Sequence, residues 1–128
     1  MAFPKLPLGP APFGGFALDP GSGQLSVGQS GVAAGAAANG QAGATQLVSL
    51  INRVVVGNTN DGLLLPTAIP GLQVVVINAT ANSLNVYPAP PGDIINALAA
   101  NAAYAVAATK VVEFYCANQG QWHTVLTA

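Results

Sequence analysis

Charged side chains are scarce in this chain. Its 128 residues hold three lysines and arginines and four aspartates and glutamates, so charged residues make up 5% of the sequence, against about 25% in an ordinary soluble domain. Lys5, Arg53 and Lys110 are scattered, and they form no basic patch that could neutralise a run of phosphates. We therefore exclude nucleic acid as a partner. We also expect copies of the chain itself, or a partner, to cover much of this weakly charged surface.

Residues that act in catalysis or metal binding are equally few. The chain has one cysteine and one histidine, so no intramolecular disulfide can form. Cys116 alternates with Val112 and Phe114, which predicts a buried, unreactive thiol. His123 follows Trp122 in a strand-like segment, where we expect a surface or interface histidine. Because an odd number of positions separates Cys116 from His123, the two side chains would point to opposite faces of a strand and not make a zinc site.

Two acidic residues lie in turn clusters. Asp61 and Asp93 each neighbour a glycine, and an Asx-type turn explains both without catalysis. The glycines around Gly21-Ser22-Gly23 lack the spacing of a phosphate-binding loop. We accordingly predict that the chain is not an enzyme and has no catalytic residue, cofactor or metal ion.

Long hydrophobic runs are also missing. No stretch reaches the roughly 18–20 apolar residues of a membrane-spanning helix, and the longest candidate, residues 97–109, is broken by Asn101. The first residues have no apolar segment typical of a secretory signal. Asn78-Ala79-Thr80 matches a glycosylation sequence, but without such a signal we interpret it as a turn. We therefore expect no membrane partner.

Residues 1–44 consist mostly of glycine, alanine and proline. They hold too few large apolar side chains to offset the conformational entropy lost on ordering, so we predict an extended N-terminal arm held by neighbouring subunits. Strand addition to a sheet edge is possible near residues 24–29. The predicted assembly contacts are the arm's apolar anchors, Phe3, Leu6, Leu8, Phe13, Phe16, Leu18, Leu25 and Val27.

Residues 45–128 have the pattern of an all-β domain. Short runs rich in β-branched residues are separated by clusters of glycine, proline and asparagine. The expected strands cover residues 47–56, 63–65, 72–78, 84–87, 104–107, 111–116 and 122–126. Six or seven short strands of this kind predict an antiparallel β-sandwich or barrel, preceded by the long extended arm.

Part of this domain resembles small virion proteins of tailed bacteriophages. The resemblance lies within residues 71–122 and is carried by Gly71-Leu72-Gln73-Val74-Val75-Val76-Ile77-Asn78, Ser83-Leu84-Asn85-Val86-Tyr87-Pro88, Gly92-Asp93-Ile94-Ile95-Asn96 and Gly120-Gln121-Trp122. These are an apolar strand, a strand with an aromatic–proline stop, a Gly-Asp turn and a last strand that begins at a tryptophan.

The resemblance implies a head decoration, or cement, protein. Such a protein would form a homotrimer on the outer surface of the capsid, bridge major capsid protein subunits and stabilise the shell. The alternative is a tail, neck or head-fibre component that binds a neighbouring virion protein or a host glycan. The aromatic residues available for a glycan are Trp122, Tyr87, Tyr104 and Tyr115. An enzyme with an unrecognised site is the third and least favoured interpretation.

Overall fold

The computed structural model describes residues 17–18, 25–26 and 28–126. Within them, all regular structure is β-strand apart from two single-turn 3₁₀ helices, η1 (Ala37–Asn39) and η2 (Gln41–Gly43). The strands are β1 (Ala17–Leu18), β2 (Leu25–Ser26), β3 (Gly28–Ala33), β4 (Thr45–Gln46), β5 (Ile51–Val56), β6 (Gly62–Leu64), β7 (Gln73–Asn78), β8 (Leu84–Tyr87), β9 (Ile94–Ile95), β10 (Tyr104–Val106), β11 (Val111–Asn118) and β12 (Gln121–Leu126).

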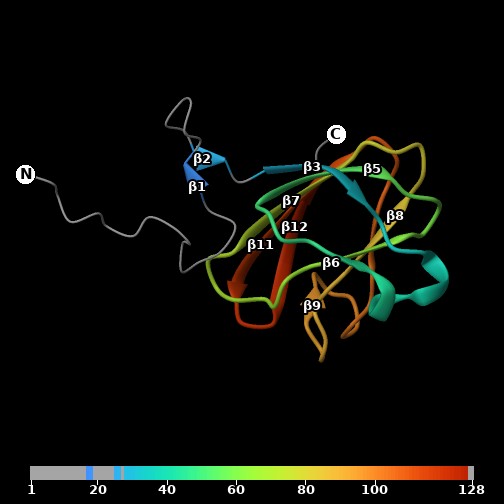
Figure 1. The fold of residues 1–128 in the computed structure, drawn as a ribbon. Helices are drawn as coiled ribbons and strands as arrows, with labels where there is room; N and C mark the ends of the chain where they lie inside the picture. Colours follow the sequence, from blue (N-terminus) through green and yellow to red (C-terminus); the bar gives the residue numbers. More distant parts are fainter. Residues whose placement is uncertain (1–16, 19–24, 27, 127–128) are drawn as a thin grey trace, which may run out of the picture.

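The strands form two main sheets and one small one. The larger sheet has the order β3-β5-β7-β11-β12-β9, the second has the order β10-β8-β6-β4, and β1 pairs only with β2. From β3 to β8 the chain alternates strictly between the two main sheets, one strand in each (Figure 1). Each return to a sheet places the new strand parallel to the previous one, as in the pairs β3–β5, β5–β7, β4–β6 and β6–β8.

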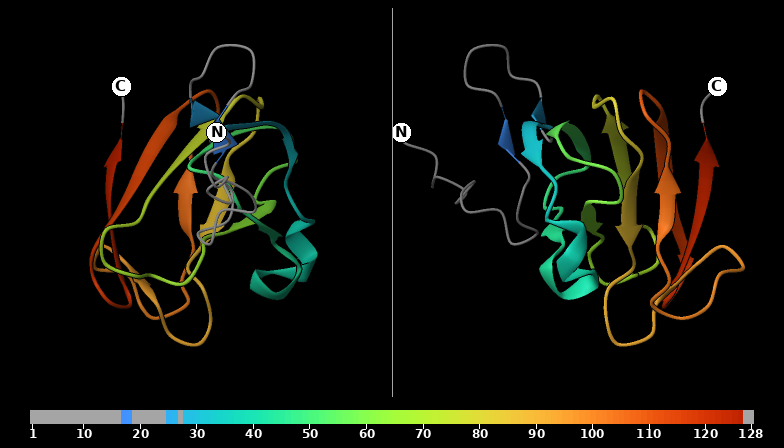
Figure 2. Two further views of the ribbon diagram at one scale, coloured as in Figure 1. Left: turned by 60° about the vertical axis from the view of Figure 1, so that its left-hand side comes forward. Right: turned by 90° about the vertical axis from the view of Figure 1, so that its right-hand side faces the viewer.

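This path makes the domain a β-solenoid with mostly parallel strands. It has about four turns, and we call each turn a coil. The prediction of an all-β domain is confirmed, but the prediction of an antiparallel sandwich or barrel is wrong. The turn cluster 57–61 explains the error, because it does not return the chain beside β5. It carries the chain across to β6 in the other sheet. Antiparallel pairing is concentrated at the end, where β11 lies between β7 and β12 and β10 pairs with β8 (Figure 2).

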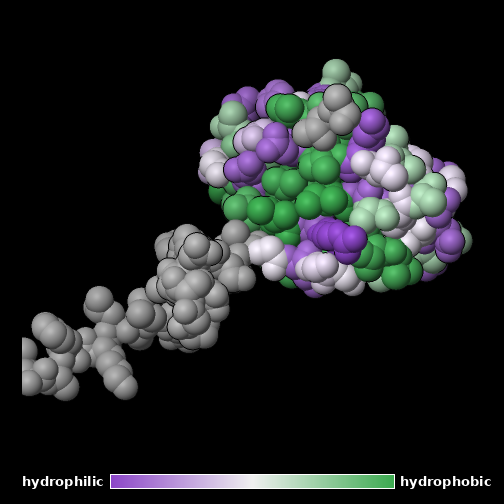
Figure 3. Space-filling model, turned by 90° about the horizontal axis from the view of Figure 1, so that it is seen from above, coloured by the Kyte–Doolittle hydropathy of each residue, from purple (hydrophilic) through white to green (hydrophobic). Residues whose placement is uncertain are grey.

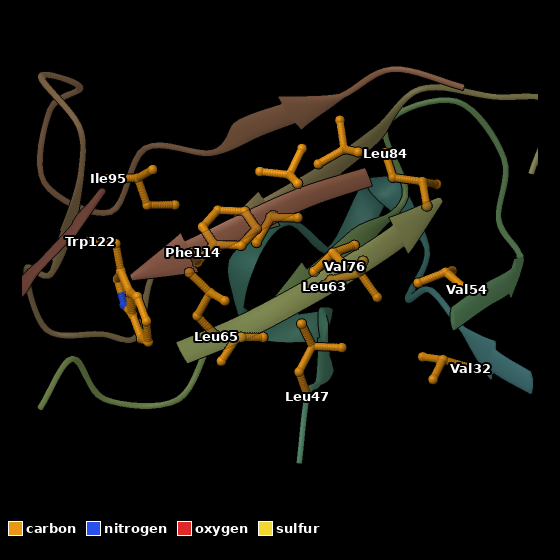
Figure 4. Close-up of a cluster of buried hydrophobic side chains, with 14 of the residues drawn as sticks. Val32, Leu47, Val54, Leu63, Leu65, Val76, Leu84, Ile95, Phe114 and Trp122 are labelled. Carbon is orange, nitrogen blue, oxygen red and sulfur yellow. The ribbon is translucent and has the colours of Figure 1, made fainter. Parts of the chain in front are cut away.

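Apolar side chains from both main sheets fill the space between them. Along β7 the residues alternate between buried and half-buried, so Val74 and Val76 point inward. On β11 the inward set is Val112, Phe114 and Cys116, as the sequence predicted. Figure 4 shows many of these side chains meeting across the two sheets. The cluster comprises Val32, Leu47, Val54, Leu63, Leu65, Ala68, Val74, Val76, Leu84, Val86, Ile95, Val106, Val112, Phe114, Cys116 and Trp122.

Two aspartate carboxylates, a buried one and a half-buried one, join successive coils. One oxygen of Asp61 accepts a hydrogen bond from the backbone N–H of Ala37 at 2.9 Å, and the other accepts one from Asn58 at 2.8 Å. Asp93 accepts a hydrogen bond from the backbone N–H of Ala68 at 2.9 Å. Both aspartates thus serve the fold, as the sequence predicted. Each accepts a hydrogen bond from a segment of another coil, and Asp61 also accepts one from its own turn.

Asn78 is the polar centre of the interior, with 1% of its surface exposed. Its side-chain N–H groups donate to the carbonyl oxygens of Asn82, Val106 and Ala107 at 2.8–3.1 Å. Its oxygen accepts hydrogen bonds from both the backbone N–H and the hydroxyl of Thr80. The Asn78-Ala79-Thr80 sequence is therefore a side-chain-stabilised turn, and its amide is fully engaged inside the protein.

The individual strand predictions are closer than the fold prediction. β8 has the predicted bounds, and β7, β11 and β12 differ by one or two residues at an end. The predicted strand 47–56 is shorter in the structure: β5 covers only residues 51–56, and residues 47–50 cross from the sheet of β4 to the sheet of β5. β9 was not predicted, since its two residues follow a proline-rich break. Residues 28–33, within the predicted arm, pair with β5 as β3.

Candidate assembly surface

The outward face of the six-stranded sheet carries an unusual number of apolar side chains. Because side chains alternate along a strand, the residues between the buried positions of β5, β7, β11 and β12 all point away from the core. Ile51 is 41% exposed, Val55 36% and Val125 50%. Val75 and Ile77 on β7 are half-buried. Parallel strands with apolar residues on both sides are typical of sheets whose two faces are both covered by protein.

Strand register arranges these side chains in rows across the sheet. Ile51, Val75 and Glu113 are consecutive neighbours from β5 to β11, and Val125 continues the row on β12. In the next row Arg53 lies beside Ile77, followed by Val111. Figure 3 looks down on the side of the molecule where β5 lies and shows hydrophobic side chains gathered in a patch with hydrophilic ones at its border. We call the outward-pointing residues of β5, β7, β11 and β12 the outer sheet face. It comprises Ile51, Arg53, Val55, Gln73, Val75, Ile77, Val111, Glu113, Tyr115, His123 and Val125.

The polar members of the outer sheet face lie mainly at one side of it. Gln73, Tyr115 and His123 form a single row, and the amide of Gln73 donates to the Tyr115 hydroxyl oxygen at 3.2 Å. Partial burial, followed by the negative charge of Glu113, raises the pKa of Tyr115. The phenol therefore stays neutral at physiological pH, and Arg53 and Glu113 are the only fully charged side chains in this set.

Most of the predicted arm contacts lie outside the described residues. Phe3, Leu6, Leu8, Phe13, Phe16 and Val27 are in this group. Leu18 is in β1 and Leu25 is in β2, where their Cα atoms are cross-strand partners. The proposed strand addition near residues 24–29 and the clamping role of the arm stay predictions.

The single cysteine and histidine occupy the positions that the sequence predicted. Cys116 is buried at 4% exposure, and its thiol donates to the carbonyl oxygen of Asn118 at 3.1 Å. Burial raises its pKa, which keeps the thiol protonated and unreactive. His123 is exposed on the outer sheet face. Within the described part of the chain, no three histidine, cysteine or acidic side chains gather to bind a metal ion.

The aromatic residues considered for glycan binding are mostly committed to the interior. Trp122 is fully buried. Tyr104 packs edge-to-face on Phe114, with ring centroids 5.9 Å apart. Tyr87 is half-buried on β8, and Tyr115 is 38% exposed.

The sequence pattern missed the outer sheet face because its apolar residues look the same as core residues when they occur in a continuous run such as Gln73–Asn78.

Comparisons with known proteins give no relative. No family model, no curated protein and no solved structure matches this chain. In the residues that the structure describes, no helix has the length and apolar character needed to cross a membrane. Function must therefore be argued from the surfaces and the chemistry of the chain itself.

Proposed function

We propose that this protein is a structural component of a bacteriophage virion that decorates and stabilises the outside of the capsid by bridging major capsid protein subunits. The observation that carries the proposal is the outer sheet face, which exposes apolar side chains on a chain with only 5% charged residues. A surface of this kind favours association with another protein surface over a monomer that is free in solution.

The resemblance to small virion proteins adds support on the level of particular elements. Its pieces correspond to β7, β8, the turn and strand at β9, and the start of β12. Together they build the third coil and part of the sheet that carries the outer sheet face. The homotrimer implied by the resemblance, and the location on the capsid exterior, stay predictions.

A tail, neck or head-fibre role is the second candidate, and one feature of the solenoid favours it. β3 and β4 are the outermost strands of their sheets at the same end of the coil. Such an end can continue by stacking another coil upon it, and end-to-end stacking produces a rod. Glycan binding receives less support, because Trp122 is buried and Tyr104 packs in the core.

Gold-labelled antibody against the protein, applied to intact particles, separates the two roles. Decoration predicts label over the whole head, and particles lacking the protein should release their genomes at lower temperature or under milder osmotic shock. Label confined to the tail or neck would support the second candidate. Absence of the protein from purified particles would contradict both.

A further inference from the structure

We propose that the outer sheet face binds the same face of a second copy of this chain, giving a two-fold symmetric pair. The inference does not depend on a role in virions, and its two-fold pair is an alternative to the homotrimer that the resemblance implies. It begins with the apolar residues Ile51, Val75, Ile77 and Val125 of this face, which are exposed or half-buried. Burial of such side chains is the main favourable term in association.

The two charges on this face are arranged to complement a copy of the face itself. Arg53 is on β5 and Glu113 is on β11, with β7 between them. Two strand spacings across the sheet and one row along it place their backbones roughly 12 Å apart. They lie in neighbouring rows, on either side of Val75 and Ile77. One cation and one anion leave the face without net charge, so two copies meet without overall repulsion.

A two-fold axis fits this arrangement. If the axis lies in the plane of the interface, crosses β7 between Val75 and Ile77 and is inclined to that strand by roughly 35°, rotation brings the Arg53 of one copy opposite the partner's Glu113. The symmetry repeats the contact, so one arrangement satisfies both charges of both copies. The same rotation places the apolar residues of one face over those of the other, and the rows of the two copies cross. Charge pairing across an interface fixes register and excludes wrong partners.

The size of the face is sufficient for a stable pair. Five strands from β3 to β12, at about 4.8 Å spacing and with about six residues each, span roughly 24 Å by 20 Å. Two copies then bury on the order of 1,000 Å², which reaches the lower end of specific interfaces. β3 contributes mainly glycine and small polar residues to this side, so it permits close approach of the partner backbone.

Sedimentation equilibrium of the full chain at micromolar concentration tests the pairing, with single charge reversals as probes. The wild type is expected to be a dimer. Arg53→Glu places four acidic groups in the interface, and Glu113→Arg places four basic ones, so each variant alone should weaken the dimer about tenfold or more. When the two variants are mixed, every opposing pair is again one cation and one anion, and a heterodimer should form. Lys110→Glu, which makes the same charge change just outside β11, is the matched control and should leave the dimer intact.

Each outcome decides the proposal. Weaker dimerisation of each single variant, with a heterodimer formed when the two are mixed, supports a two-fold pair through this face. A wild-type monomer, a wild-type trimer, or a dimer that is unaffected by both reversals would overturn it. Circular dichroism checks that the variants are folded. Should either reversal fail to fold, Val125→Lys is the second probe, because that side chain is 50% exposed; a folded Val125→Lys protein that still dimerises like the wild type would also overturn it.

Discussion

Single polar residues determine how the interior of this protein holds together. Asn78 satisfies three carbonyl oxygens and two donors of Thr80 from one buried side chain. An apolar substitute would remove all of these hydrogen bonds. The carbonyl oxygens of Asn82 and Ala107 keep another donor, and each buried group left unsatisfied costs about 1–3 kcal/mol. Asparagine is therefore needed at this position for hydrogen bonding, not for its size.

We expect Asn78→Ala to lower the free energy of unfolding by about 2–4 kcal/mol, because several buried hydrogen bonds are lost together. Urea unfolding followed by circular dichroism measures the change. Asn118→Ala, at an exposed position at the end of β11, is the control and should be close to neutral. Equal stability of the two variants would show that the Asn78 network contributes little.

Cys116 gives the protein a pH dependence of stability at alkaline pH. Its pKa is raised by burial in the folded state, so the folded protein holds the thiol proton more tightly than the unfolded chain does. This contribution is complete below the unfolded pKa of about 8.5 and is lost as the pH rises through the folded value. Unfolding measured from pH 7 to pH 10 should show falling stability, and Cys116→Ala should reduce that slope.

The same variant should cost about 1–2 kcal/mol at neutral pH through lost packing. His123→Gln, on the exposed side of β12, should be nearly silent. A thiol reagent should react with Cys116 in the wild type far more slowly before unfolding than after it. Rapid labelling of the folded protein would contradict the buried, protonated thiol.

On the scale of whole elements, short polar contacts hold one coil upon the next. Asp61 joins the first residue of η1, Ala37, to the turn between β5 and β6. At Gly35 an added Cβ would overlap the carbonyl oxygen of Gly43, so the backbones of the first coil approach too closely for any side chain there. The first coil is thus fixed by a carboxylate at one point and by a glycine contact at another.

Asp61→Ala should therefore loosen the first coil while leaving the last strands in place. Two backbone N–H groups, those of Ala37 and Asn58, lose their acceptor. Hydrogen exchange followed by mass spectrometry should show faster exchange in β3, η1 and η2, with β11 and β12 protected as before. Asp61→Asn, which keeps one side-chain acceptor, should have a smaller effect. Uniformly faster exchange across all strands would show that the coils do not behave as separable units.

The element scale also shows how far the sequence reached. Alternation and turn residues were enough to locate β7, β8, β11 and β12, since these signals are local. Assigning strands to sheets requires knowing which sheet the strand after each turn joins. The identity of the turn residues does not determine this. Equivalent strands lie about 23 residues apart, a spacing within the range of solenoid repeats, but they share no recognisable motif.

The candidate surface was only partly foreseeable for a related reason. The predicted alternation of Cys116 with Val112 and Phe114 along β11 leaves the polar members Glu113 and Tyr115 on the outward side. The apolar members of β7 lie in a continuous apolar run, which does not distinguish the inner face of the strand from the outer one. Only the three-dimensional register reveals that Ile51, Val75 and Val125 form one row.

For the molecule as a whole, the first coil and the residues before it should contribute separately. Deleting residues 1–27 should leave the solenoid folded, because β3 and Val32 remain to cover β5. Deleting residues 1–44 removes Val32 and exposes Val54, which should lower the free energy of unfolding by about 1–3 kcal/mol.

If the arm is a clamp, the shorter deletion should weaken binding to particles lacking the protein by orders of magnitude, with an unchanged near-ultraviolet spectrum. A deletion variant that decorates such particles as tightly as the full chain would refute the clamp.

The central claim is that this chain acts by covering the surface of a virion in many copies. Quantitative mass spectrometry of purified particles, with the major capsid protein as internal reference, tests it most directly. Decoration predicts copies on the order of hundreds per particle, in a fixed ratio to the capsid lattice, as closed symmetric assemblies require. Tens of copies or fewer, or no protein in the particle at all, would contradict it.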